Sequence, residues 1–103
     1  MLTSANKEEI LSGKAIATPI KSLGLKGRGV VFINDSDCVR LIDRASRFLR
    51  KDAEAFVAIL AAASSSTKQT LNGYILVRRA PVCSKAKAWL NERGVTIEVI
   101  EDH

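Results

Sequence analysis

The residues best placed to do chemistry lie around Cys83, where an expected strand passes into an expected helix. The strand pattern GYILVRR is followed by the turn APVC (80–83) and then by the helical pattern SKAKAWLNER. A thiol in the first turn of a helix lies near unpaired backbone N–H groups and the positive end of the helix dipole, and Lys85 and Lys87 add positive charge. The arrangement predicts a lowered pKa and makes Cys83 a candidate reactive thiol.

The turn APVC and the segment SKAKAWLNERGV (84–95) resemble the active-site turn and helix of glutaredoxins and of the arsenate reductase and Spx-like branch of the thioredoxin superfamily. The resemblance covers less than a third of the chain. In that superfamily the first cysteine of the turn is the nucleophile, and here Ala80 stands at its position. Cys83 corresponds to the second, resolving cysteine, so the resemblance implies a single-thiol activity at most and no dithiol oxidoreductase.

The same helix also has an interpretation without chemistry. Cys83, Ala86 and Leu90 fall at i, i+3 and i+7, which is the buried stripe of an amphipathic helix that ends at Gly94. Trp89, the single tryptophan, lies beside this stripe. It is either a residue at the edge of the core or an anchor for a protein partner, because tryptophan is favoured at interface hot spots.

A second candidate is a strip of cations on an expected helix that follows the strand VVFIN (30–34). The apolar residues of that helix fall at one helical face, and they are Cys38, Leu41, Ile42, Ala45, Phe48 and Leu49. The opposite face carries Arg40, Arg44, Arg47 and Lys51 at i, i+4, i+7 and i+11. Such a strip is long enough to span several phosphates, although a solvated helix face with Asp43 paired to Arg47 explains the same pattern.

A third candidate is the segment IKSLGLKGRG (20–29), where Lys21, Lys26 and Arg28 lie among three glycines. It lacks the order of a phosphate-binding P-loop. Flexible basic segments of this kind either clamp nucleic acid or serve as plain linkers. Phe32 and Tyr74 are too few for the aromatic platform of an RNA-recognition motif, so we expect any nucleic-acid contact to be electrostatic and tolerant of sequence.

The charge of the chain agrees with an anionic partner. Its 103 residues fit one domain with a modest core. The formal net charge is +5, and the excess of lysine and arginine lies in the first half of the sequence. Such a balance favours nucleic acid or an acidic protein surface as the partner.

The use of cysteine and histidine excludes several kinds of site. Two cysteines are too few for a disulfide framework, and no cluster has the spacing of a zinc site, so we expect no metal and no cofactor. The single histidine is His103 at the end of the sequence, where we do not expect it to form a catalytic pair. The sequence has no signal-peptide pattern and no apolar run of membrane-spanning length, and we expect a cytoplasmic protein.

The elements that position these residues follow from hydrophobic patterning. Residues 1–28 are expected to form an N-terminal arm, or a short helix starting at Ser4 and ending near Gly13 followed by a loop. Residues 29–103 are expected to form a single α+β domain. The apolar segment AEAFVAILAAA (53–63) fits either a buried strand or a helix, and the strand is preferred because Lys51-Asp52 precedes it and SSSTKQT follows it.

With that choice the order of elements is that of a ferredoxin-like βαββαβ sandwich. If residues 53–63 are helical, the alternative is a three-stranded α/β layer. We expect a small non-catalytic binding module whose favoured partner is nucleic acid. The alternative is a protein-interaction or regulatory protein, of the kind encoded on mobile elements, that docks through Trp89 or forms a homodimer through an exposed sheet edge. An enzyme with a single thiol at Cys83 ranks third.

Overall fold

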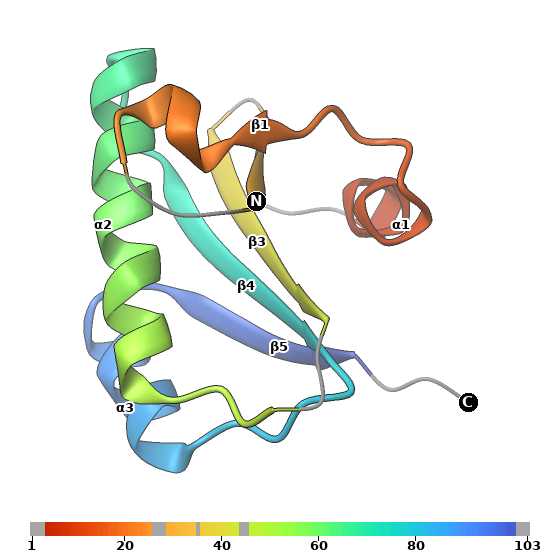
Figure 1. Cartoon of the computed structure of the whole chain (residues 1–103), viewed down its shortest axis with the longest axis vertical. Coiled ribbons are helices and arrows are strands. Elements are labelled where there is room, and N and C mark those ends of the chain that lie inside the picture. The colour runs from red at the N-terminus through yellow and green to blue at the C-terminus, as the bar shows by residue number, and fades with distance from the viewer. Residues whose placement is uncertain (1–3, 26–28, 35, 44–45, 101–103) are drawn as a thin grey trace.

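The computed structural model describes residues 4–25, 29–34, 36–43 and 46–100, and Figure 1 shows their arrangement. The helices are α1 (Ser4–Ser12), α2 (Arg50–Thr67) and α3 (Ser84–Glu92), with a short 3₁₀ helix η1 (Ile20–Leu23). The strands are β1 (Thr18–Pro19), β2 (Val30–Asn34), β3 (Asp37–Asp43), β4 (Asn72–Arg78) and β5 (Thr96–Ile100).

The strands form one mixed sheet in the order β1-β2-β3-β4-β5. The first three are antiparallel neighbours, and Asn34 pairs with Asp37 where β2 turns into β3. The last three are parallel, with Val39 opposite Tyr74 and Tyr74 opposite Thr96. The helices α2 and α3 connect the parallel strands. The protein therefore has an α+β fold in which a hairpin precedes two parallel crossovers.

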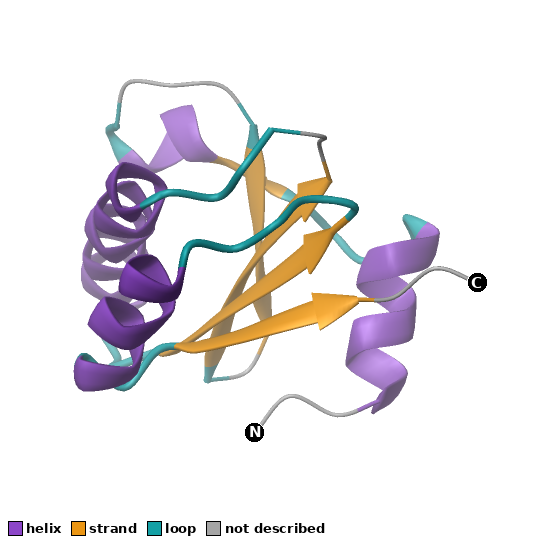
Figure 2. Cartoon of the chain, turned by 90° about the horizontal axis from the view of Figure 1, so that it is seen from below, coloured by secondary structure: helices purple, strands orange, loops and turns teal. Residues whose placement is uncertain are grey.

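The helices divide between the two faces of the sheet, as Figure 2 shows: α2 and α3 lie on one face and α1 lies on the other. Ile10 of α1 is buried together with Val39 and Leu76 in a small cluster. Lys7 of α1 also forms an ion pair of 2.8 Å with Glu98 of β5. The N-terminal helix is thus fixed against the sheet by both apolar and charged contacts.

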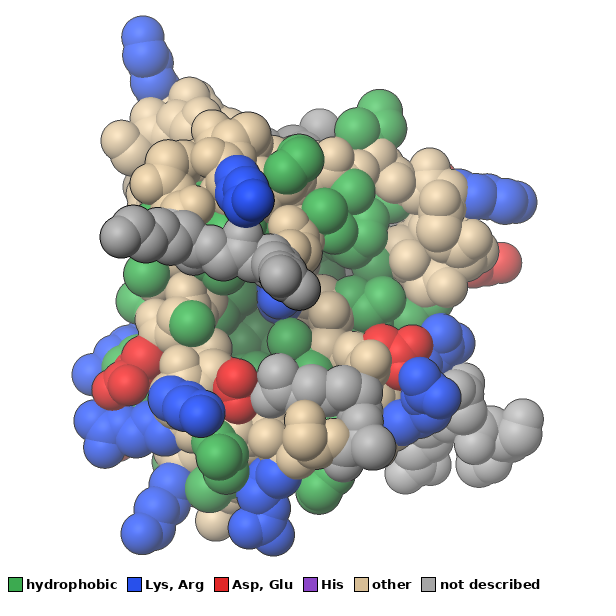
Figure 3. Space-filling view, viewed as in Figure 1, with side chains coloured by type: hydrophobic (Ala, Val, Ile, Leu, Met, Phe, Trp, Pro, Cys, Tyr) green, Lys and Arg blue, Asp and Glu red, His purple; other side chains and the backbone are tan. Residues whose placement is uncertain are grey.

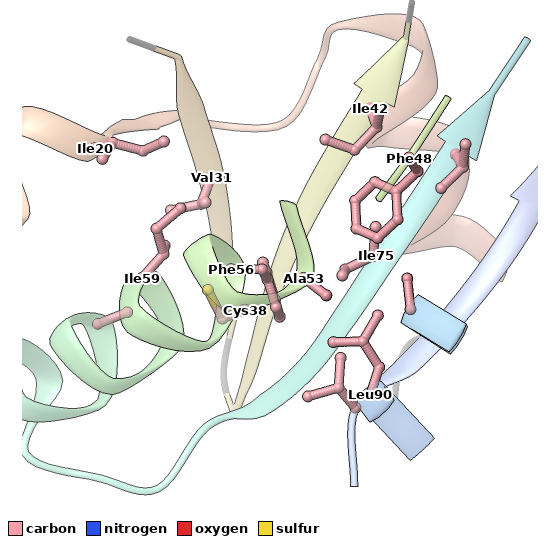
Figure 4. Packing of buried hydrophobic residues seen from close by; sticks show 14 of the residues in the cluster. Ile20, Val31, Cys38, Ile42, Phe48, Ala53, Phe56, Ile59, Ile75 and Leu90 are labelled. Atoms are coloured by element: carbon pink, nitrogen blue, oxygen red, sulfur yellow. The ribbon is translucent and has the colours of Figure 1, made fainter. Parts of the chain in front are cut away.

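The larger core fills the space between the sheet and the pair α2 and α3. Figure 4 shows Ala53 and Phe56 of α2, Ile75 of β4 and Leu90 of α3 directed into this space. All four residues are buried. The sheet face toward α2 and α3 is therefore the main source of hydrophobic stabilisation.

The expected helix over residues 38–49 is wrong, because residues 37–43 form strand β3. Cys38 and Ile42 point toward α2, whereas Val39 packs in the cluster beneath α1. A strand that is covered on both faces buries consecutive apolar residues, so its sequence matched a helical period by coincidence.

The preferred strand over residues 53–63 is also wrong, because these residues belong to helix α2. Its buried residues, Ala53, Phe56, Ile59 and Ala63, follow helical spacing. The carboxylate of Asp52 accepts a hydrogen bond of 2.8 Å from the N–H of Leu49, which satisfies a free donor at the start of the helix. The pair Lys51-Asp52, which was predicted to separate a helix from a strand, lies in the first turn of α2.

The remaining expected elements are confirmed. They are the short helix that starts at Ser4, the strand VVFIN, and the final strand, helix and strand of the chain. The ferredoxin-like order is not confirmed, since β4 is parallel to both of its neighbours. The α/β alternative assigned residues 53–63 correctly, but the sheet has five strands rather than three. Within the described part of the chain, no helix is long and apolar enough to cross a membrane.

Candidate functional site

The candidate site lies at the edge of the sheet where the three parallel strands end and where α2 and α3 begin. Two connecting segments, residues 46–49 and 79–83, meet there. The N–H of Phe48 donates to the carbonyl of Pro81 at 2.8 Å, and the N–H of Cys83 donates to the carbonyl of Phe48 at 3.0 Å. These bonds form a short parallel bridge between the segments. In sheets of parallel strands, this edge is the usual place for ligands.

Cys83 is the residue that caps the N-terminus of α3, and its side chain is half-buried. The backbone N–H groups of Ala86 and Lys85 face the sulfur and lower the pKa of Cys83. Partial desolvation opposes this effect, while the positive charges of Arg47 and Lys85 reinforce it. Ala86 and Leu90 are fully buried, so Cys83 sits at the exposed end of the buried stripe of α3.

Native-state alkylation is expected to separate the two cysteines. Cys38 is 0% exposed, and burial raises its pKa to about 11. The lowered pKa of Cys83 means that its thiolate forms at a lower pH than that of a free thiol. With iodoacetamide near neutral pH, peptide mass spectrometry should find Cys83 modified and Cys38 protected. The rate at Cys83 should reach its plateau at a lower pH than the rate of N-acetylcysteine, and equal pH profiles would contradict the lowered pKa.

The expected strip of four cations on one helix face does not form. Arg40 lies on β3, where its guanidinium Nη1 donates to the carbonyl of Val30 at 2.7 Å and lies against Gly29. Arg47 lies in the segment before α2, and Lys51 is exposed in the first turn of α2. Arg44 lies outside the described residues. The structure therefore places Arg47 and Lys51 on either side of the first residue of α2, Arg50, and Arg40 in a structural contact with β2.

The basic segment 20–29 lies elsewhere. Lys21 is an exposed residue of η1, which packs beside the end of α2 that is farthest from Arg50 (Figure 1). Lys26 and Arg28 lie outside the described residues. Lys21 is thus the one expected basic residue of this segment that the structure describes, and it lies at the opposite end of α2 from Lys51.

Trp89 lies on α3, and the guanidinium groups of two arginines lie close to its ring. The guanidinium carbon of Arg93 lies 3.7 Å from the centroid of the indole ring, and that of Arg50 lies 5.8 Å from it. Arg93 also donates from Nη1 to the carbonyl of Trp89 at 3.1 Å. Arg93 was not among the residues predicted from the sequence, although its position four residues after Trp89, at the C-terminal cap of α3, was a usable signal.

Exposed cations therefore surround the starts of α2 and α3. We call this surface the cationic edge, and its residues are Arg47, Arg50, Lys51, Arg79 and Lys85. Figure 3 shows lysine and arginine side chains gathered in the lower part of the molecule, over these elements. The surface also carries acidic side chains, which pair as Arg79 with Asp43 at 2.7 Å and Arg50 with Glu54 at 3.5 Å. Exposed ion pairs of this kind are weak, so an incoming anion can compete for the arginines.

A separate hollow of about 280 Å³ lies between α1 and β2, away from the cationic edge. Its lining is largely apolar and includes Ile10 and Phe32, together with the polar residues Glu9, Lys14 and Asn34. Among the residues that the structure describes, no group of three or more histidine, cysteine or acidic residues is placed to hold a metal ion. We therefore assign no binding or catalytic role to the described residues that line the hollow.

Comparison with protein-family models, with curated protein sequences and with solved structures finds no match to the chain.

Proposed function

We propose that the protein is a small, non-catalytic binding module that contacts the phosphates of nucleic acid through the cationic edge. The observation that carries this proposal is the gathering of exposed lysine and arginine around two helix N-termini at one edge of the sheet. A polyanion bound there meets both side-chain charges and helix dipoles of favourable sign.

The rest of the molecule supports an electrostatic mode of binding. The net charge of +5 attracts a polyanion at long range. The cations come from two helices and from the segments that precede them, and the bridge between Phe48 and Val82 holds those segments together. Because these segments are already held together, binding of a phosphate backbone does not have to order them. This limits the loss of conformational entropy on binding.

Salt-dependent binding tests the proposal. We expect a fluorescently labelled oligonucleotide to bind at about 50 mM salt and to weaken as the salt rises, because each phosphate contact releases counterions. The double variant Arg47→Ala/Lys51→Ala should weaken binding at low salt by at least about tenfold and should lower the slope of log K against log salt by about 2. Fluorescence anisotropy measures both quantities.

The matched control removes two charges elsewhere. Lys14 and Lys68 are exposed and lie outside the cationic edge, so Lys14→Ala/Lys68→Gln should leave the affinity and the slope nearly unchanged. Lys21→Ala tests the basic segment 20–29 on its own. No binding at low salt, or equal losses in the two double variants, would refute the proposal.

A second candidate function, homodimerisation, is favoured by the outer edge of β5. Val99 on this strand is 55% exposed, and β5 is the last strand of the sheet. The other edge is the two-residue strand β1, which ends in Pro19 and so lacks one backbone donor. A second copy pairing antiparallel along β5 would join two sheets into one.

Light scattering across a range of concentrations tests this candidate. We expect a dimer mass for the natural chain and a monomer mass for Val99→Lys, because the charge would be buried at the new strand pair. Thr96→Lys, also exposed and on the opposite face of β5, serves as the comparison variant. A monomer at all concentrations would exclude the homodimer.

A further inference from the structure

Resting on the proposed function, we infer that the nucleic acid is single-stranded and that one of its bases stacks on an arginine–tryptophan pair at the C-terminal end of α3. The pair consists of Arg93 and Trp89, whose side chains are already in face contact at 3.7 Å. A flat guanidinium held on an indole ring offers a second flat surface to a base.

The pair lies within a line of cations. Lys85 and Trp89 are spaced four residues apart and so lie along one side of α3, and Arg93, which caps the C-terminus of the helix, contacts the ring of Trp89. The distance from Lys85 to Arg93 along the axis is about 12 Å, at 1.5 Å per residue. An extended strand following this line would place phosphates near the cations and a base between them.

Two contacts with Trp89 hold the guanidinium of Arg93 in place, beside its weak, exposed ion pair with Glu92 at 3.8 Å. One is the ring contact with Trp89, and the other is the hydrogen bond from Nη1 to the carbonyl of Trp89. The guanidinium carbon of Arg50, on α2, lies 5.8 Å from the centroid of the same ring, so cations from α2 and from the end of α3 converge on one aromatic residue. The side chain of Arg93 is 43% exposed, which leaves part of it open to solvent.

This arrangement favours an unpaired base over a duplex. In a duplex the faces of the bases are stacked on one another and only their edges are open, whereas a single strand can splay a base onto a flat partner. An acidic protein would satisfy the charges of the line but would make no use of the flat pair at its centre. The combination of charge and planar surface therefore points to single-stranded nucleic acid.

The test uses the intrinsic fluorescence of Trp89, which is the only tryptophan in the chain. The whole protein is titrated with an unlabelled oligothymidylate and, separately, with a duplex of the same length. We expect the single strand to bind at least about tenfold more tightly and to quench Trp89. Arg93→Lys keeps the charge but removes the flat surface, and it should weaken single-strand binding by roughly tenfold without changing the salt slope.

The control is Arg47→Lys, the same change at a cationic-edge residue away from the indole, which should change affinity by no more than about twofold. Equal binding of single strand and duplex without a change in fluorescence would overturn this inference and leave the proposed function standing. Absence of binding to either oligonucleotide would overturn both. Quenching by polyglutamate but not by oligothymidylate would assign the surface to an acidic protein and also overturn the inference.

Discussion

Replacing Ala63 with lysine is expected to lower the free energy of unfolding by at least about 3 kcal/mol, because the new charge would be buried without a partner. Ala63 is 0% exposed and belongs to the core between α2 and the sheet. Lysine is too large for this position as well as charged, so overpacking adds to the loss. Urea denaturation followed by circular dichroism measures the change.

Ala61→Lys is the matched control, because Ala61 is exposed on the same helix. In a helix, residues two positions apart point to different sides, whereas in a strand they share one face. The helical assignment of residues 50–67 therefore predicts a large loss for Ala63→Lys and a change within about 0.5 kcal/mol for Ala61→Lys. Similar losses in the two variants would support a strand over this segment and contradict the fold.

The same two residues show why the sequence did not decide this segment. In AEAFVAILAAA nearly every position is apolar or small, so the exposed Ala61 and the buried Ala63 are the same residue type. The hydrophobic period carries no information where both faces have equal polarity. Only the packing of α2 against the sheet distinguishes the two positions.

Strand β3 shows the opposite difficulty, since its pattern was clear but led to the wrong element. Cys38, Leu41 and Ile42 match a helical stripe, yet Leu41 packs toward the α1 side of the sheet and the other two toward α2. Whether a strand is buried on both faces depends on helices outside the strand, here α1 and α2. The pattern within the strand itself carries no information about them. The elements whose ends carry strong turn or capping signals, such as α3 between Pro81 and Gly94, were predicted correctly.

The candidate site was partly predictable for the same reason. The position of Cys83 at the start of α3 follows from local sequence, and the structure confirms that position. The grouping of Arg47 with α3 was not predictable, because it depends on β3 and β4 being parallel neighbours, which brings residues 46–49 beside residues 79–83. Arg40, expected to bind a partner, instead connects β3 to the carbonyl of Val30.

Replacing Phe48 with alanine is expected to reduce both stability and the order of the cationic edge. Phe48 is 1% exposed, and Figure 4 shows its ring among Ile42 and Ile75. Truncation of a buried phenylalanine costs about 3–5 kcal/mol, since it leaves a cavity where the ring was packed. Urea denaturation should show this loss, whereas Leu49→Ala, at a neighbouring residue that is 39% exposed, should cost less than about 1 kcal/mol.

The second effect follows from the backbone of Phe48, which bonds to Pro81 and Cys83. Without the ring to anchor it, the segment before α2 should hold the start of α3 less firmly. The N–H groups of Ala86 and Lys85 would then face the sulfur for less of the time, and the pKa of Cys83 should rise toward its ordinary value. The pH profile of Cys83 alkylation in the folded Phe48→Ala variant should therefore shift to higher pH. An unchanged profile would show that the start of α3 keeps its geometry without the ring of Phe48.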